Sequence, residues 1–167
     1  MPKCATVNIP PNISEFWSRF KTASDSVSDD QFYEAFHFGD TAALADELLN
    51  LVLSNKKRAT AGSLWMFEFR GVSPPRIGDL SVVTDSTGDP MCVIQTTAVA
   101  VVPFLEVSAE FARAEGEGDA TLASWREDHT VFFNRECDRI GRQFNHSMPV
   151  VCERFDLVYS EAASSTA

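Results

Sequence analysis

The chain has 167 residues, 44% of them hydrophobic and 13 of them Phe, which is enough to bury the core of one domain. A net charge of -10 with only 14 Lys and Arg argues against a general nucleic-acid binder, because such proteins neutralise many phosphates with clustered basic side chains. The sequence contains no apolar run as long as a membrane span or a secretory signal, so we expect a cytoplasmic protein with no membrane partner.

The domain organisation is expected to be simple. Residues 1–11 lack an apolar pattern and are expected to form a flexible N-terminal arm, whereas the Ser- and Ala-rich residues 161–167 form a flexible tail. Residues 12–160 contain no linker and no internal repeat, which predicts a single domain.

The first half of the chain is predicted to be helical. Apolar residues at helical spacing predict a first helix with one buried stripe, formed by Ile13, Phe16, Trp17 and Phe20. A second helix is expected to begin after a cap at Asp40 or Thr41 and to run to about Asn55, because Asn tolerates the left-handed conformation that ends helices. Its buried face is predicted to be Leu44, Leu48, Leu51 and Val52.

The middle of the chain is predicted to form antiparallel strands. Residues 64–69 suggest one strand, and residues 77–80 lead into another at 81–84. Residues 85–90 are dense in turn-forming residues, and the β-branched run at 91–102 predicts a long strand after that turn.

The last third returns to helices and closes with a strand. Residues 107–114 predict a short helix that Gly116 and Gly118 break, and residues 122 to about 140 predict a longer one. One side of the longer helix carries Trp125, His129, Phe132 and Glu136. A strand follows at 150–159, and helices on both sides of a small sheet without regular alternation predict an α+β fold with a highly curved sheet or barrel.

The densest basic cluster in the sequence is Lys56, Lys57 and Arg58, followed closely by Thr60. A Lys three residues before a hydroxyl residue can contact a phosphate or act as a base beside a nucleophile. The alternative is a solvated helix end, where cations are favoured by the negative pole of the helix dipole.

An acidic patch interleaved with glycines lies at Glu115, Glu117 and Asp119. Its turns can hold a carboxylate near the chemistry of a neighbouring strand, and carboxylates with water and phosphate suit Mg²⁺ or Mn²⁺. The alternative is a solvated loop.

The remaining reactive side chains favour structural roles. His129 shares a helical face with Trp125 and Phe132, so we expect it to be packed rather than catalytic. The cysteines have neither close pairing nor zinc-ligand spacing, so we expect no disulfide and no zinc site from Cys4, Cys92, Cys137 and Cys152. No Gly-rich phosphate loop, nucleophile elbow or zinc-peptidase signature occurs.

Six segments, taken in order, resemble the ASCH family, in particular its small bacterial members. They are EAFHFGD at 34–40, LVLSNKKRAT at 51–60, RIGDL at 76–80, VIQTT at 93–97, FARAEGEGD at 111–119 and WREDH at 125–129. The resemblance implies a PUA-like curved sheet or barrel with flanking helices, here preceded by an N-terminal helical extension.

The resemblance also implies a function linked to RNA. The first expectation is a hydrolase that cleaves single-stranded RNA; the alternatives are an amidohydrolase that deacetylates N4-acetylcytidine-type nucleosides and a non-catalytic RNA-binding module. No cofactor is required, although a divalent metal, Mn²⁺ or Mg²⁺, is compatible with RNA cleavage. The expected partner is therefore single-stranded RNA or a modified nucleoside.

In the amidohydrolase members the catalytic set is a Lys, a Thr three residues later and a Glu, which match Lys57, Thr60 and Glu115. Thr60 would attack or orient water, Lys57 would act as a base or stabilise negative charge, and Glu115 would move protons. We expect these three side chains to converge on one pocket. One residue departs from the family pattern: Asn55 stands where Gly is frequent.

Substrate contacts are expected from the neighbours of this set. Lys56 and Arg58 would bind RNA or a nucleoside through their charge, and Trp65 would stack on a base.

Overall fold

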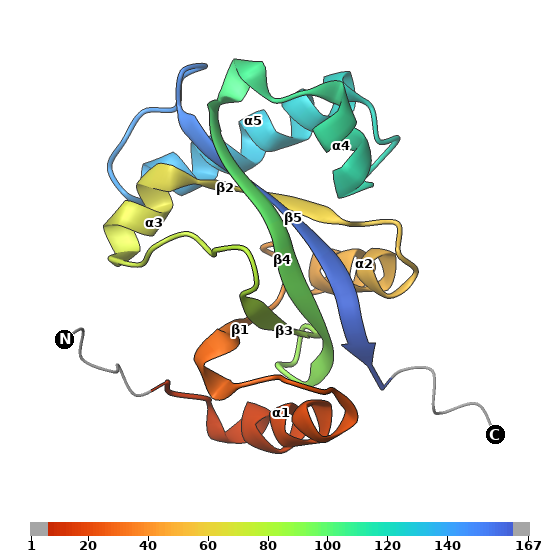
Figure 1. Cartoon of the computed structure of the whole chain (residues 1–167). Coiled ribbons are helices and arrows are strands. Elements are labelled where there is room, and N and C mark those ends of the chain that lie inside the picture. Colours follow the sequence, from red (N-terminus) through yellow and green to blue (C-terminus); the bar gives the residue numbers. More distant parts are fainter. Residues whose placement is uncertain (1–6, 162–167) are drawn as a thin grey trace.

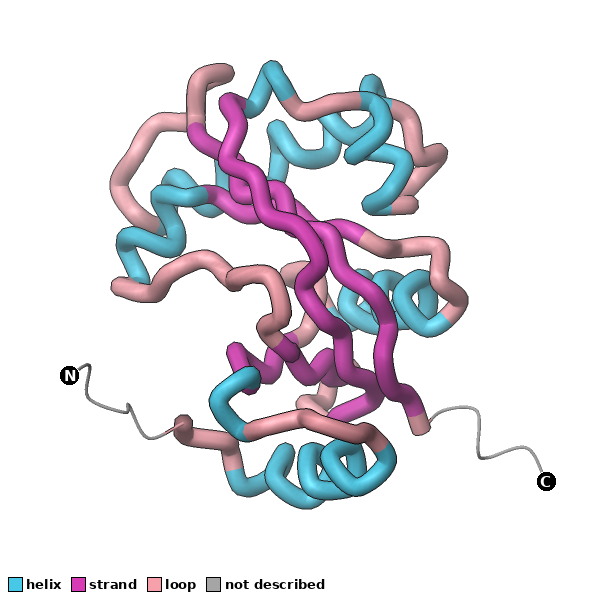
Figure 2. The backbone as a smooth tube through the Cα atoms, viewed as in Figure 1, coloured by secondary structure: helices cyan, strands magenta, loops and turns pink. Residues whose placement is uncertain are grey.

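The computed structural model describes residues 7–161, in which helices surround one mixed sheet (Figures 1 and 2). The strands are β1 Phe32–Phe36, β2 Ala59–Ser63, β3 Leu80–Thr84, β4 Pro90–Pro103 and β5 Pro149–Ser160. The helices are α1 Pro11–Ala23, α2 Ala42–Leu53, α3 Leu64–Arg70, α4 Ala109–Glu115 and α5 Leu122–Arg139. Short 3₁₀ turns occupy Asp29–Gln31 and Phe104–Glu106.

The strand order is β1-β3-β4-β5-β2, with β1 parallel to β3 and the other neighbours antiparallel. The edge strands β1 and β2 are not neighbours, so the sheet is open rather than a closed barrel. The predicted α+β class with a small curved sheet is confirmed.

The long strands β4 and β5 join the two ends of the molecule. They pair from Cys92 opposite Ser160 to Pro103 opposite Pro149, with register shifts near residues 93 and 96. In Figure 1 this pair crosses the molecule diagonally, with α4 and α5 at one end and α1 at the other. The core accordingly has separate clusters, one under α4 and α5, one beside α2 and one under α1.

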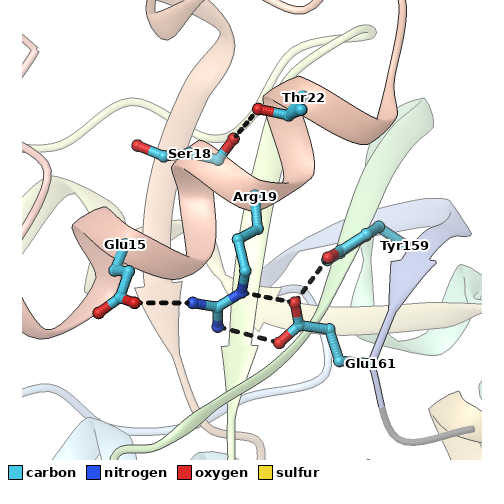
Figure 3. Close-up of polar contacts among 6 residues, drawn as sticks. All are labelled: Glu15, Ser18, Arg19, Thr22, Tyr159 and Glu161. Atoms are coloured by element: carbon cyan, nitrogen blue, oxygen red, sulfur yellow. Dashed lines mark hydrogen bonds and ion pairs between the residues drawn. The ribbon is translucent and has the colours of Figure 1, made fainter. Parts of the chain in front are cut away.

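The first helix forms as predicted, and each residue of its apolar stripe is buried: Ile13, Phe16, Trp17 and Phe20. Its polar side is attached to the end of β5, because Arg19 contacts both carboxylate oxygens of Glu161 at 2.7 and 3.0 Å. Tyr159 donates a hydrogen bond to the same carboxylate at 2.7 Å (Figure 3). The N-terminal helix is therefore an integral part of this fold.

The second helix also matches its prediction. Thr41 is the cap, since its hydroxyl accepts from the Leu44 N–H at 3.2 Å, and Asn55 has the left-handed φ of 64°. The fully buried face differs in part from the expected one and consists of Ala45, Leu48, Leu49 and Val52.

Two elements differ from the sequence prediction. Residues 64–69 were expected to be a strand but belong to α3, and the strand is β2 immediately before them. Gly71, at φ 68°, ends that helix. β1 lies in the half that was expected to be helical; all five of its residues are half-buried, so it lacks the alternation that identifies a strand.

The cysteines that the structure describes agree with the expectation of reduced thiols, because Cys92, Cys137 and Cys152 are all free and buried. Cys4 lies outside the described residues, as do most of the predicted N-terminal arm and nearly all of the predicted tail. Within residues 7–161, no helix has both the length and the apolar character needed to cross a membrane.

Candidate functional site

The segment between α2 and β2 holds Lys57 inside the protein. After the left-handed Asn55, the backbone N–H of Lys57 donates to the Leu51 carbonyl at 3.0 Å. The next residue, Arg58, donates its backbone N–H to the Ala114 carbonyl of α4 at 2.7 Å. These contacts draw the segment inward, and Lys57 is only 2% exposed.

The Lys57 amine has two acceptors and one aromatic neighbour. Nζ donates to the Ala59 carbonyl at 2.9 Å and to Glu117 Oε1 at 2.5 Å. It also lies 5.1 Å from the centre of the Phe38 ring, within range of a cation–π attraction. Because Ala59 directly precedes Thr60, the amine fixes the backbone from which the Thr60 side chain projects.

Glu115 is 1% exposed and is held by α5. Its Oε2 accepts from Trp125 Nε1 at 2.6 Å and lies 3.0 Å from His129 Nε2. The other His129 nitrogen, Nδ1, lies 2.9 Å from the Trp125 carbonyl, and the two rings stack at 4.1 Å. Both imidazole nitrogens therefore face acceptors, which is the arrangement of a protonated ring.

The charges of Lys57, Glu115 and His129 stabilise one another. Burial by itself raises the pKa of Glu115, but the Lys57 charge and the hydrogen bond from His129 outweigh it, so the pKa is lowered. Burial lowers the pKa of His129, but its hydrogen bond and attraction to Glu115 outweigh that effect, so the pKa is raised. We call this group the buried cluster: Lys57, Glu115, Glu117, Trp125 and His129.

A close backbone approach at Gly116 arranges the two carboxylates of the buried cluster. Gly116 is left-handed at φ 66°, and a Cβ there would lie 2.1 Å from the Lys56 carbonyl oxygen. Only glycine fits both conditions. Glu115 and Glu117 therefore flank the point where α4 meets the segment that carries Lys57.

A metal ion fits the buried cluster poorly. Glu115, Glu117 and His129 offer ligand atoms within 4.8 Å of one another. The Lys57 ammonium already contacts Glu117 Oε1, however, and Trp125 Nε1 and His129 Nε2 both contact Glu115 Oε2. A cation would have to displace these donors and face the positive charge of Lys57.

Thr60 lies in a different compartment, a cavity of about 210 Å³ between β1, β2, α3, α5 and β5. Its lining includes Glu34, Phe36, Thr60, Phe67, Glu136 and Glu153, with Arg70 as its basic residue. Thr60 and Glu153 are direct partners across the β2–β5 pair, so both side chains stand on one face of the sheet.

The carboxyl groups of this cavity are poorly solvated. Burial raises the pKa of Glu153 to about 7, against the effect of a hydrogen bond from Thr96 at 2.7 Å. Burial also raises the pKa of Glu34 and of Glu136. Within the described residues, Glu136 Oε2 is buried without a hydrogen-bond partner. These shifts are opposite to that of Glu115.

The structure thus brings two of the three expected catalytic residues, Lys57 and Glu115, into the buried cluster and places Thr60 in the adjacent cavity. The two compartments meet at an edge-to-face contact of 4.8 Å between Phe36, which lines the cavity, and Phe38, which lies under the Lys57 amine.

The expected substrate-binding residues lie outside this cavity. Lys56 is exposed, and Arg58 is exposed with a long ion pair to Asp156 at 3.4 Å. Trp65 is half-buried on α3, and its ring is covered by the Arg142 guanidinium at 4.4 Å. The aromatic residue of α3 that reaches the cavity is Phe67.

Arg58 belongs to an open groove on the other side of β5, with Arg113 and Arg154. Acidic neighbours offset these charges: Arg154 pairs with Glu110 at 3.3 Å, and Arg58 pairs with Asp156.

Two functional candidates were not assigned from the sequence. The sequence marks Glu117 only as part of an acidic patch, yet it is the carboxylate that contacts Lys57. The one sequence signal for Glu153 is its place directly after Val151 and Cys152, because a Glu in an apolar strand is unusual.

The comparisons with known proteins agree with this fold. Residues 34–159 match the ASCH domain model, so the chain belongs to the ASCH domain family. The crystal structure of an ASCH domain from Lactobacillus crispatus JV V101 matches with a TM-score of 0.83 and 31% identity, covering 91% of this chain and 97% of that one.

A protein of Enterococcus faecalis V583 matches with a TM-score of 0.80 and 31% identity, covering 92% of this chain and 91% of that one. This structural likeness extends into the segment before residue 34. No curated protein matches the chain.

Proposed function

We propose that this ASCH protein is a hydrolase that removes an acyl group from a small neutral nucleoside of the N4-acetylcytidine class, in the cavity beside Thr60. The substrate class comes from the family resemblance. The acidity of the cavity favours this reaction over cleavage of single-stranded RNA, which was the first expectation from the sequence.

The observation that carries the proposal is the lining of the cavity. Three carboxyl groups line the cavity beside a single guanidinium, so it offers a phosphate group only one cationic partner. A neutral heterocycle that donates N–H groups would instead satisfy carboxyl oxygens, between the apolar walls of Phe36 and Phe67. The volume of about 210 Å³ is too small for several nucleotides but can enclose the acylated base of one nucleoside.

The roles of the three expected residues follow from their contacts. Thr60 presents a hydroxyl that has no hydrogen-bond partner among the described residues, and it serves as nucleophile or orients water. Lys57 does not line the cavity; it positions Thr60 through the Ala59 carbonyl. Glu115 anchors Trp125 and His129 behind that segment.

The test uses two substrates in parallel. Purified protein is incubated with N4-acetylcytidine and, separately, with labelled single-stranded RNA, each with EDTA and with Mn²⁺. We expect cytidine and acetate to be released in EDTA, with the RNA intact. Cleavage of the RNA without deacetylation would overturn the proposal, and loss of deacetylation in EDTA would overturn its metal independence.

Thr60→Val and Lys56→Met make a matched pair for this assay. Both side chains are near the start of β2, but only Thr60 lines the cavity. Thr60→Val should lose deacetylation, whereas Lys56→Met should keep it.

A further inference from the structure

We propose that Glu153 is the proton donor of the cavity: it holds the N3–N4 edge of the pyrimidine and protonates ring N3 as the acyl C–N bond breaks. This inference rests on the proposed function and assigns a residue to a step that Lys57, Thr60 and Glu115 leave without a donor.

The first support is position. Glu153 stands directly opposite Thr60 in the antiparallel β2–β5 pair, and both line the cavity. Side chains directly opposite in such a pair have Cβ atoms roughly 5 Å apart. A hydroxyl and a carboxyl on side chains that start this close together can reach adjacent parts of one ligand, the acyl carbon and the ring that leaves.

The second support is orientation. Thr96 is buried on β4 and donates its hydroxyl to Glu153 Oε1 at 2.7 Å. Oε1 is therefore an acceptor, and a proton on the carboxyl group resides on Oε2. Among the described residues no other side chain or N–H donates to Glu153, so Oε2 is available to a ligand.

The third support is charge. Burial raises the pKa of Glu153 to about 7, and the charges of Glu34 on β1 and Asp79 before β3 act in the same direction. Lys57 opposes them. Glu136 from α5 and Arg70 from α3 also face the cavity. Near neutral pH a large fraction of Glu153 thus carries a transferable proton, as a general acid requires.

The chemistry of the substrate matches this group. An N4-acylated cytosine presents an acceptor at N3 and one donor at N4–H, and carboxyl groups accept from cytosine N4. Protonated Glu153 donates from Oε2 to N3 while a carboxyl oxygen accepts from N4–H. This pairing leaves the acyl group free to face Thr60, which lines the same cavity.

The oxygen of Thr60, or of the water that it orients, adds to the acyl carbon and releases its proton to solvent. The tetrahedral adduct then collapses: the electron pair of the C–N bond forms C4=N4, and the π pair of C4=N3 moves to N3. At the same time the Glu153 proton passes to N3. Cytosine leaves as its imino tautomer and returns to the amino form in water, and Glu153 regains a proton from solvent. The acyl group is released as the carboxylic acid after addition of water.

Glu153→Gln separates binding from proton transfer. The amide can donate to N3 and accept from N4–H, so KM should stay within about threefold, but it cannot transfer a proton at neutral pH. We expect kcat to fall at least about 100-fold, the usual contribution of general acid catalysis. Activity of the wild-type protein should fall above about pH 7, and the residual activity of Glu153→Gln should lack that decline.

Asp79→Asn is the electrostatic control, because Asp79 raises the pKa of Glu153 from outside the cavity lining. Asp79→Asn should lower the pKa of Glu153, so the fall of activity at alkaline pH, the alkaline limb, should begin at a lower pH. A wild-type protein that hydrolyses N4-acetylcytidine with no alkaline limb would overturn the role of Glu153, even if no variant folded. So would unchanged kcat in Glu153→Gln. A wild-type protein without deacetylase activity would overturn the proposed function itself.

Discussion

The buried cluster around Glu115 and the cavity beside Thr60 both remove carboxyl groups from water, but they satisfy them differently. Glu115 receives an indole N–H and an imidazole, and Glu117 receives an ammonium. In the cavity, Thr96 is the one described donor to Glu153, and Glu136 Oε2 has no described partner.

We interpret this difference as one between the scaffold and the proposed binding site. A buried polar group with partners stabilises one conformation, whereas a group without partners costs free energy until a ligand satisfies it. The pKa directions agree with that division, because the pKa of Glu115 is lowered while burial raises the pKa of Glu153 to about 7. The cluster is therefore expected to govern stability, and the cavity to govern activity.

The largest effect on stability is expected from Lys57→Met. Removal of the amine leaves Glu117 without its cation and takes one of two favourable charges from the buried Glu115; breaking a buried ion pair costs roughly 3–5 kcal/mol. The exposed neighbour Lys56 is the matched control, and Lys56→Met should change stability by less than about 0.5 kcal/mol. Urea unfolding measures both; equal midpoints would contradict a stabilising role for Lys57.

The second largest loss of stability is expected at Gly116, the glycine that arranges the buried cluster. Gly116 and Gly71 each follow a seven-residue helix, at φ 66° and 68°. A Cβ at Gly71 meets nothing within 4 Å, so Gly71→Ala carries only the left-handed strain, about 1 kcal/mol.

At Gly116 the added Cβ also meets the Lys56 carbonyl, so Gly116→Ala should cost roughly 2–4 kcal/mol. Thermal or urea unfolding compares the two variants. Equal losses would show that the approach of α4 to Lys56 does not hold the cluster together.

These elements also show what the sequence reveals. The α1 stripe and α5 could be predicted because their apolar side chains recur at helical spacing. The long β4 and β5 strands could be predicted because each contains a run of β-branched and other apolar residues. β1 could not, since it is an edge strand with every residue half-buried. The sequence predicted a strand at 64–69 instead of a helix, because these residues are mostly aromatic and apolar, a composition that suits either element.

Only the part of the site that neighbouring residues form could be predicted from the sequence. Lys57 and Thr60 lie on one short segment, and their spacing is visible in the sequence. The contact of Lys57 with Glu117 joins residues sixty positions apart and depends on the close approach at Gly116. The lining of the cavity draws Glu34, Glu136 and Glu153 from three separate elements, which no spacing rule connects.

A pH titration of stability should give opposite signs for the two compartments. The lowered pKa of Glu115 contributes stability that is present above its unfolded value of 4.5 and is lost as pH falls through the folded value. The raised pKa of Glu153 contributes stability that is present below 4.5 and is lost as pH rises through about 7.

Relative to wild type, Glu115→Gln should therefore be destabilised at pH 7 and recover toward acidic pH. Glu153→Gln should become more stable relative to wild type as the pH rises from 4.5 to about 7. We expect the two variants to change in opposite directions, with a change on the order of 3 kcal/mol for Glu153→Gln, measured by urea unfolding at several pH values. The same sign for both variants would remove the distinction between cluster and cavity.

The smallest effect on stability is expected from Thr60→Val, together with a complete loss of activity. The Thr60 hydroxyl has no hydrogen-bond partner in the described part of the chain, and Val preserves both its shape and its preference for a strand. The unfolding free energy should change by less than about 0.5 kcal/mol. Thr96→Val is the matched control, because Thr96 is buried and donates to Glu153; its loss should cost about 1–3 kcal/mol. Unfolding and deacetylation are measured on both variants. If Thr60→Val were as destabilised as Thr96→Val, its hydroxyl would already have a structural partner, and a catalytic role in an open cavity would lose its physical basis.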